Sequence, residues 1–239
     1  MNIKKGYKRL KLDMTSRYGD MQYELNVPYY LNGELVICNN GYHLCKNMLD
    51  TVLFYDSEDS KLFEVEYNAD NCIETKNKLC SDYIKIIREI PIEEYHNYIK
   101  EYVKNNDILS EDWITRSEVA KQGFCLDILI NDKKSSVRYE VAKQGYGLDK
   151  LINDEDRSVR CEIVKQGYGL DKLINDEDYY VRSKVAKQGY GLDVLINDKD
   201  YYVRCEVAKQ GFGLDILVND KDFDVKNIAR QKLKELNNE

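Results

Sequence analysis

The sequence predicts an α+β domain followed by an all-α superhelical array of short helix pairs, an α-solenoid. The first observation is a 22-residue unit in the second half of the chain, which occurs five times, starting at Val119, Val141, Ile163, Val185 and Val207. Self-similarity at a period of about 20–50 residues is typical of stacked arrays, in which one unit cannot bury its apolar face alone. The second observation is that residues 1–90 lack this repeat and contain short apolar runs, several of which alternate with polar residues.

Residues 1–90 are predicted to form a small α+β domain. Runs rich in aromatic and aliphatic residues predict strands at Gly6–Leu12, Met21–Asn26, Glu34–Cys38, Lys61–Tyr67 and Tyr83–Ile90. The dipeptide Asn32-Gly33 predicts a hairpin turn between Tyr29–Leu31 and Leu35–Ile37, because both central residues of a type I′ turn need a positive φ. Residues 47–54 are predicted to form a short helix.

A clear helix is predicted to begin at Pro91. Proline in the first turn of a helix costs no hydrogen bond, since the first N–H groups have no partner in the helix. We expect residues 91–106 to be a helix that joins the sheet domain to the array and caps it, because terminal repeats need their apolar faces covered. Residues 107–239 would then hold the α-solenoid, with five copies of the repeat and a C-terminal cap.

Each repeat is predicted to contain two short helices joined by an acidic turn. In the copy at residues 167–188, Leu170 and Leu173 lie on one face of the first helix. Asp178 is placed to cap the second helix, because its carboxylate can accept from free N–H groups of the first turn. Val181 is expected to face inward, and Gly189 to end the helix in the left-handed conformation.

Charged residues recur at fixed positions of the repeat. Arginines fill one position (Arg116, Arg138, Arg160, Arg182, Arg204), aspartates a second (Asp132, Asp154, Asp176, Asp198, Asp220) and lysines a third (Lys121, Lys143, Lys165, Lys187, Lys209). The planar guanidinium favours bidentate bonds, so we expect each arginine to bind a turn aspartate or carbonyl of a neighbouring repeat. The alternative is a surface on which the arginines or lysines contact phosphates. For the lysines we expect a solvated face that balances the acidic turns.

The repeat resembles the leucine-rich repeat variant family and the related HEAT-like repeats. The resemblance is carried by the pattern Asp-x-Asp-x-x-Val-Arg-x-x-Val-Ala followed by Leu-x-x-Leu, as in residues 198–208 with Leu214 and Leu217. It covers about half of the chain and implies a right-handed superhelix of short paired helices. The 22-residue period and the Gly-Tyr-Gly turn depart from the family pattern, which leaves the curvature open. Arrays of this kind bind many different partners, so the resemblance implies a fold and no particular function.

Composition narrows the function classes. The net charge of −7 argues against a general nucleic-acid binder, which usually has a basic domain. No apolar run approaches 18 residues and the first residues lack an apolar core, so we expect neither a membrane span nor a signal peptide. Seven cysteines, an odd number, fit reduced thiols in the cytoplasm better than a disulfide framework.

The predicted contact surface is the pair of residues that precedes each Val-Arg of the repeat. This pair differs from copy to copy, whereas positions held by stacking stay constant. Because Tyr and Trp often anchor protein interfaces, we expect a partner-binding stripe along the array. It comprises Trp113, Arg157, Tyr179, Tyr180, Tyr201 and Tyr202. The alternative is that one member of each pair packs between repeats and the other is simply exposed.

The first half resembles an uncharacterised domain of phage and prophage proteins. The resemblance is carried by Gly6-Tyr7-Lys8, the motif Cys38-x-x-Gly41-Tyr42-His43-x-Cys45, and the runs at residues 63–66 and 84–90. It brings no activity with it. Cys38, His43 and Cys45 are weak candidates for a zinc site, since their spacing differs from the common knuckles. A catalytic Cys–His pair around His43 is a second alternative. We expect instead that the cysteines are buried and have a structural role.

The sequence therefore favours a non-catalytic interaction or inhibitor protein. Its array would bind a macromolecule, most simply a protein, and the phage resemblance suggests phage–host conflict as the setting. We expect no cofactor, no metal and no membrane partner. One alternative is an enzyme with a catalytic first domain around His43 that the repeats target. Another is nucleic-acid binding along the lysine and arginine rows, which the acidic composition disfavours.

Overall fold

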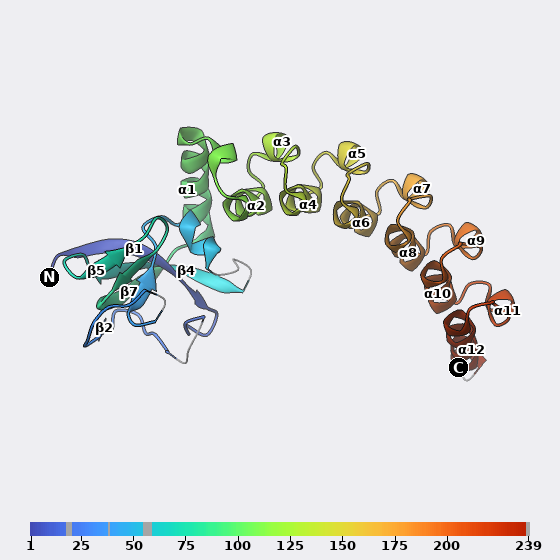
Figure 1. Cartoon of the computed structure of the whole chain (residues 1–239), viewed down its shortest axis with the longest axis horizontal. Helices are drawn as coiled ribbons and strands as arrows, with labels where there is room; N and C mark the ends of the chain where they lie inside the picture. Colours follow the sequence, from blue (N-terminus) through green and yellow to red (C-terminus); the bar gives the residue numbers. More distant parts are fainter. Residues whose placement is uncertain (18–20, 38, 55–58, 238–239) are drawn as a thin grey trace. The chain divides into compact units, whose positions relative to one another are not determined.

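The computed structural model describes residues 1–17, 21–37, 39–54 and 59–237, and the chain forms two compact units (Figure 1). The first unit is Met1–Cys125 and the second is Leu126–Glu239. The domain bounds predicted at residues 90 and 106 were based on changes in the sequence pattern, whereas the two units are defined by which residues pack together. The helix of the first repeat, α2 (Trp113–Lys121), packs with the 3-10 helix η1 (Leu49–Leu53) and so falls in the first unit.

The first unit is built on two antiparallel sheets in the part of the chain that the structure describes. The larger sheet has the strand order β1-β4-β7-β2 and consists of β1 (Ile3–Lys11), β4 (Ser60–Asn68), β7 (Tyr83–Glu89) and β2 (Pro28–Tyr30). The smaller sheet has the order β3-β6-β5, with β3 (Tyr42–Leu44), β6 (Leu79–Ser81) and β5 (Cys72–Glu74). The three longest predicted strands are confirmed as β1, β4 and β7, although burial does not alternate along β4, where residues 62–65 are all buried.

The predicted hairpin at Asn32-Gly33 is wrong. Residues 28–30 pair with β7, with Tyr29 opposite Ile84, and Val36 forms an isolated bridge with Asn40. Gly33 does have a positive φ of 115°, but the aromatic rings decide the pairing: Tyr30 lies 5.1 Å from Tyr83, centroid to centroid. Tertiary packing thus overrides the local turn signal. The expected strands at residues 21–26 and 34–38 are likewise reduced to isolated bridges among the residues described.

The core of this unit lies against the larger sheet. Val65 of β4 and Ile84 and Ile86 of β7 are fully buried, and Phe63 is nearly so. Helix α1 (Ile92–Asn105) begins directly after Pro91, as predicted, and buries Tyr95 and Ile99. Burying one such side chain contributes roughly 1.5–3 kcal/mol relative to exposing it, so these contacts decide where the helix lies.

A charged network ties α1 to the sheet. Arg88 of β7 donates to Glu64 at 2.9 Å and to both carboxylate oxygens of Glu94 at 2.7 Å. The hydroxyl of the next residue, Tyr95, donates to Glu118 of α2 at 3.3 Å. Helix α1 therefore contacts both the sheet and the first repeat helix, with the short 3-10 helix η2 (Ile108–Ser110) leading from one to the other.

The second unit is a row of alternating short and long helices. Helices of one turn are α3 (Leu126–Leu129), α5 (Leu148–Leu151), α7 (Leu170–Leu173), α9 (Leu192–Leu195) and α11 (Leu214–Leu217). The longer ones are α4 (Ser135–Lys143), α6 (Arg157–Lys165), α8 (Tyr179–Lys187), α10 (Tyr201–Lys209) and α12 (Phe223–Asn237). Within this row the long helices line the inner side of the curve and the short helices the outer side (Figure 1).

The repeat is held together as the sequence predicts. Val181, Val185 and Ala186 of α8 are fully buried between neighbouring long helices. Asp178 accepts from the N–H of Tyr180 at 2.8 Å, which confirms its capping role, and Gly189 has the expected positive φ of 76°. The helical array predicted for the second half is thereby confirmed. Over the residues described, no helix combines the length and the apolar character needed to cross a bilayer.

Candidate functional site

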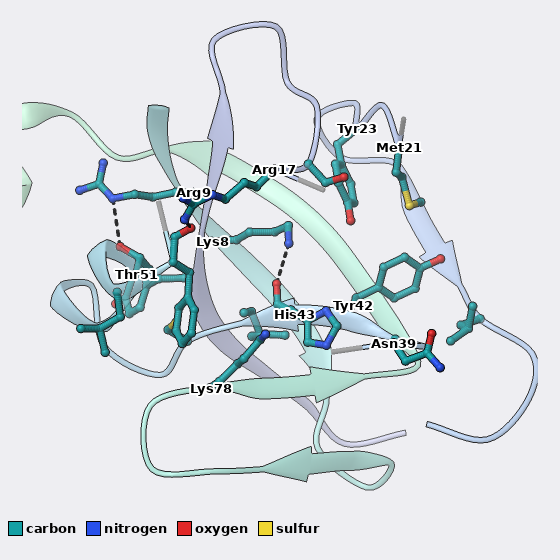
Figure 2. A pocket seen from close by; sticks show the side chains of 18 residues that line it. Lys8, Arg9, Arg17, Met21, Tyr23, Asn39, Tyr42, His43, Thr51 and Lys78 are labelled. Atoms are coloured by element: carbon teal, nitrogen blue, oxygen red, sulfur yellow. Dashed lines mark hydrogen bonds between the residues drawn. The ribbon is translucent and has the colours of Figure 1, made fainter. Parts of the chain in front are cut away.

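His43 and Cys45 lie in a cavity of the first unit, with a volume of about 580 Å³ (Figure 2). The cavity is bordered by β1, β3 and the segment around η1. His43 is the central residue of β3, which pairs with β6 on one side, and Cys45 follows this strand and exchanges two backbone hydrogen bonds of 2.7 Å with Tyr7 of β1. The sequence motif therefore delivers two of its three residues to one cavity, and Cys38 lies outside the described residues.

The chemistry of these two residues is set by burial. Burial raises the pKa of the Cys45 thiol to about 12, so the thiol stays protonated at neutral pH. Burial, together with the cations of Lys78 and Lys8, lowers the pKa of His43 to about 4, so its imidazole is neutral. A cysteine nucleophile needs a lowered pKa, which makes the Cys–His pair a poor catalytic candidate. In the described ranges no group of three or more His, Cys, Asp or Glu side chains is placed to hold a metal ion.

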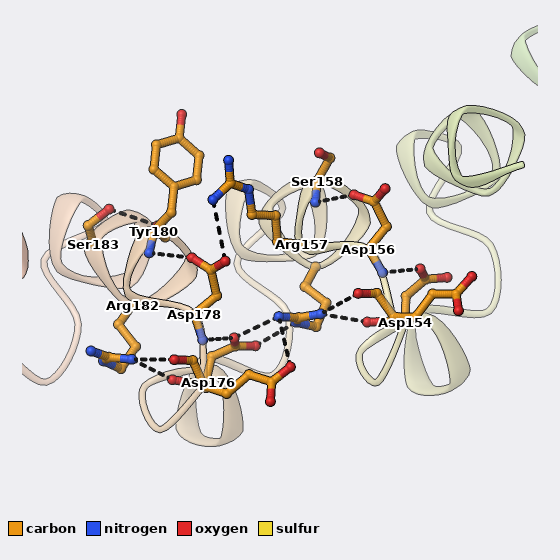
Figure 3. Close-up of polar contacts among 12 residues, drawn as sticks. Asp154, Asp156, Arg157, Ser158, Asp176, Asp178, Tyr180, Arg182 and Ser183 are labelled. Atoms are coloured by element: carbon orange, nitrogen blue, oxygen red, sulfur yellow. Dashed lines mark hydrogen bonds and ion pairs between the residues drawn. The ribbon is translucent and has the colours of Figure 1, made fainter.

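In the array, the recurring arginines and aspartates form a buried ladder (Figure 3). Four of the five arginines donate from Nε and Nη2 to both carboxylate oxygens of an aspartate sixteen residues later, at 2.6–2.9 Å; the pairs are Arg138–Asp154, Arg160–Asp176, Arg182–Asp198 and Arg204–Asp220. A third bond, from Nη1, goes to the carbonyl of the aspartate six residues earlier, as in Arg182 to Asp176 at 2.7 Å. The predicted structural role of these arginines is confirmed, and their guanidinium groups are buried within the stack.

The aromatic ridge, which we define as Tyr179, Tyr180, Tyr201 and Tyr202, opens helices α8 and α10. Each pair follows an aspartate N-cap, so the cap hydrogen bond fixes the backbone that carries the second tyrosine: Asp178 holds the N–H of Tyr180 and Asp200 that of Tyr202. Three of the four side chains are exposed, at 37% for Tyr179, 42% for Tyr180 and 52% for Tyr202. In Figure 3, Tyr180 points away from the arginine–aspartate ladder.

Three tyrosines of the ridge pack against one another across two repeats. The rings of Tyr179 and Tyr202 are stacked with centroids 5.7 Å apart, and Tyr201 and Tyr202 lie 4.5 Å apart. Stacking of this kind stabilises a ring pair by about 0.5–1.5 kcal/mol. The ridge is therefore a preformed surface, since its side chains are already held in place by each other.

Tyr180 lies instead between two cations. The Arg157 guanidinium of the preceding repeat is 5.4 Å from the ring centroid, and the Lys184 ammonium, one turn further along α8, is 4.6 Å from it. Beside Tyr180 runs a groove of about 560 Å³ between the long helices, whose lining includes Lys165, Lys184 and Lys187. This part of the array surface is thus both aromatic and positively charged, although the chain as a whole is acidic.

The remaining predicted contact residue, Trp113, opens α2 in the first unit and is 43% exposed. Phe223 occupies the position of the repeat that Tyr201 holds one copy earlier, but it is not among the predicted contact residues. It opens α12 and is 73% exposed, which is the highest value among the large apolar side chains described. Its position next to an N-cap aspartate is the signal that could have selected it.

Residues 4–98 match the model of a family described as a domain of unknown function, DUF7666. This match covers the two sheets and the first half of α1, including the cavity around His43. The match confirms an uncharacterised domain in this part of the chain and brings no activity with it. No curated protein and no solved structure matched the chain.

Proposed function

We propose that the repeat array binds a protein partner through the aromatic ridge and that the partner contributes an acidic segment. The observation that carries this proposal is the arrangement of five of the predicted contact residues. Arg157 and the four ridge tyrosines come from three consecutive long helices; Tyr179, Tyr201 and Tyr202 pack together, and Arg157 lies beside the Tyr180 ring.

Tyrosines suit this role for a physical reason. A tyrosine ring buries a large area on binding, and it has few rotatable bonds to immobilise. In this ridge the entropic cost of immobilising the side chains on binding is lower still, because Tyr179 and Tyr202 are stacked before any partner binds. A partner side chain that packs against the ridge would thus gain contact area without first ordering the surface.

The charge beside the ridge favours an acidic partner. Lys184 and Arg157 flank Tyr180, and the adjoining groove carries Lys165 and Lys187. Two of these cations already have partners, since Arg157 lies 3.4 Å from Asp178 and Lys165 lies 3.6 Å from Glu162. Carboxylates of a partner would add to these pairs and steer association, an effect that weakens as salt is added.

Nucleic acid is the alternative ligand to a protein partner. Cations beside aromatic rings are also how single-stranded nucleic acids are bound. The arginine row, however, is occupied by its ladder of aspartates, which removes half of the phosphate-binding surface considered above. Catalysis around His43 has less support, because Cys45 and His43 are both held neutral.

We place this activity in the cytoplasm, where the six described cysteines, all of them free, would stay reduced. We further propose that the repeats are a variant of the leucine-rich repeat variant and HEAT-like arrays. In the setting of phage–host conflict, binding by the array would inhibit or recruit the partner protein. These proposals on location, repeat family and setting rest on the sequence, and they do not depend on whether the ridge binds a partner.

The test is capture from a nuclease-treated host-type lysate, followed by titration of the purified partner. The bait is the full chain, and the ridge variant is Tyr179→Ala/Tyr180→Ala/Tyr202→Ala. The matched control is Tyr146→Ala/Tyr168→Ala, which removes two tyrosines exposed at 42% from the turns after α4 and α6. We expect the ridge variant to bind at least about 30-fold more weakly, since a hot-spot tyrosine contributes about 2 kcal/mol or more.

The charge part of the proposal has its own variant. Lys184→Glu should weaken binding and reduce its salt dependence, whereas Lys199→Glu, a change of an exposed lysine in the turn before α10, should do neither. The proposal fails if the ridge variant and the tyrosine control bind the partner equally. It also fails if nuclease removes the captured material, in which case nucleic acid is the ligand.

A further inference from the structure

The cavity around His43 is lined by an unusual set of charges. Four basic side chains border it, Lys8, Arg9, Arg17 and Lys78, and none of its described lining residues is acidic. They come from β1, from the segment after it and from the turn before β6, so they are distant in sequence and are brought together only by the fold. Figure 2 shows Lys8, Arg17, His43 and Lys78 around one space.

Lys8 is the most informative of these residues. It is only 6% exposed, and its ammonium donates to the backbone carbonyl of His43 at 2.6 Å. The Tyr23 ring lies 5.6 Å from the ammonium, and no described carboxylate forms an ion pair with it. A buried ammonium without a counter-charge is costly to keep. Such a group in a cavity is a candidate for ligand binding, because an anion would supply the missing charge.

The other three cations, Arg9, Lys78 and Arg17, each contact other parts of the fold. Arg9 is used by the fold, since its Nε donates to Thr51 at 3.1 Å and its guanidinium lies 5.2 Å from the Tyr95 ring. Lys78 lies 5.0 Å from the Phe54 ring, and Arg17 donates to the carbonyl of Phe54. Burial is the main cause that lowers the pKa values of Lys8 and His43, and the charge of Lys78 adds to both shifts.

The walls and the volume limit the kind of anion. About 580 Å³ lies in the range of small-molecule sites and far exceeds what a bare inorganic anion fills. The walls include four aromatic rings, those of Tyr7, Tyr23, Tyr42 and Phe54. Aromatic walls favour a planar or apolar group, and a cluster of lysine and arginine favours phosphate oxygens.

We propose that this cavity binds a small organic phosphate that carries a planar ring, with the phosphate among Lys8, Arg17 and Lys78 and the ring against the tyrosines. The neutral imidazole of His43 borders the same cavity. Gly41 supports this wall, because a Cβ there would come within 2.2 Å of the Cys80 sulfur. The proposed site lies wholly in the first unit and does not depend on the ridge.

The test is calorimetric titration of the full chain with four classes of probe. These are inorganic phosphate, ribose 5-phosphate, the ribonucleoside 5′-monophosphates and the matching nucleosides. We expect a nucleoside monophosphate to bind most tightly and Lys8→Met and Lys78→Met each to weaken it about 10- to 100-fold, the range for losing a charged hydrogen bond. The matched control is Lys61→Met, which removes an exposed lysine of the same unit that pairs with Glu89 at 2.9 Å.

A second readout is the NMR titration of the two histidines. A bound phosphate would offset the repulsion from Lys78 and Lys8, so the pKa of His43 should rise when the probe is added, whereas His96 of α1, which is bonded to Gln122 at the end of α2, serves as an internal reference. The proposal is overturned if no monophosphate binds at about 10 mM. It is also overturned if inorganic phosphate binds as tightly, if nucleosides bind as tightly, or if Lys8→Met binds as the Lys61 variant does.

Discussion

Arg182 and Asp198 form a bidentate pair that joins two consecutive repeats. Arg182 Nε donates to one carboxylate oxygen at 2.7 Å and Nη2 to the other at 2.9 Å, and the two side chains are 6% and 7% exposed. The same pair recurs in three other places along the array. It closes the acidic turn of one repeat onto the long helix of the repeat before it.

Removing one partner of this pair should destabilise the array strongly. Arg182→Met leaves Asp198 buried without its partner, and we expect the free energy of unfolding in urea to fall by about 3–5 kcal/mol. The matched control is Arg157→Met, because Arg157 is exposed and lies 3.4 Å from Asp178; its loss should cost less than about 1 kcal/mol. Equal losses in the two variants would contradict a stabilising role of the ladder.

The same ladder predicts loss of stability in acid. Burial alone would raise the pKa of Asp198, but hydrogen bonds from Arg182 and from the N–H of Asp200 outweigh it and hold the pKa below its usual range. The stabilisation is therefore complete above the unfolded value of about 4 and is lost as the pH falls below it. Urea unfolding between about pH 5 and pH 2.5 should show a steeper loss for the wild type than for Asp198→Asn. Parallel curves would contradict this account.

Two neighbouring turn glycines allow the cost of a left-handed backbone to be measured separately from the cost of a side-chain clash. Gly191 and Gly189 both have positive φ, of 60° and 76°, but a Cβ at Gly191 would lie 2.2 Å from Ile174 Cδ1, whereas one at Gly189 would meet nothing within 4 Å. Gly189→Ala should therefore cost about 1–2 kcal/mol, for the left-handed backbone alone. Gly191→Ala should cost more, because Ile174 must also move, and thermal unfolding of the two variants measures the difference. A smaller loss for Gly191→Ala would show that this turn is not tightly packed.

The array could be predicted from the sequence because its signals are local and agree with one another. The Asp178 cap, the inward Val181 and the terminal Gly189 each act within one helix, and every copy repeats them. The ridge could be predicted for the same reason, since its residues occupy one position of the repeat. What the sequence could not supply was the stacking of Tyr179 on Tyr202, which depends on how two repeats are rotated against each other.

The first unit was harder to predict because long-range contacts determine it. The Asn32-Gly33 signal failed when Tyr29 and Tyr30 paired with β7 rather than with the nearby apolar run. The motif around His43 places two of its residues at the cavity, but it does not reveal Lys8 and Lys78, which border the same cavity and are far away in sequence. Sequence spacing cannot predict that two lysines lie near this histidine, because they are brought together only when the sheets form.

Burial of Lys8 makes a last prediction in alkali. Burial is the main cause that lowers the pKa of Lys8 to about 8, with Lys78 adding to it and Cys45 and Cys80 opposing it. The unfolded value is about 10.4, so between about pH 8 and pH 10.4 the folded chain releases a proton that the unfolded chain keeps. The stability of the wild type should therefore rise over this range relative to that of Lys8→Met, by up to about 3 kcal/mol.

The measurement is urea unfolding of the wild type, Lys8→Met and Lys61→Met at several pH values, with differences taken at each pH. Other groups that titrate in this range, including the tyrosines and cysteines, cancel in these differences. At pH 7 the ammonium is charged in both states and its burial cost is fully present, while Lys8→Met loses the hydrogen bond to the His43 carbonyl. The two effects oppose each other, so the pH dependence is the diagnostic quantity. A constant difference between the wild type and Lys8→Met would mean that Lys8 is well solvated, which would also remove the main support for an anion site beside it.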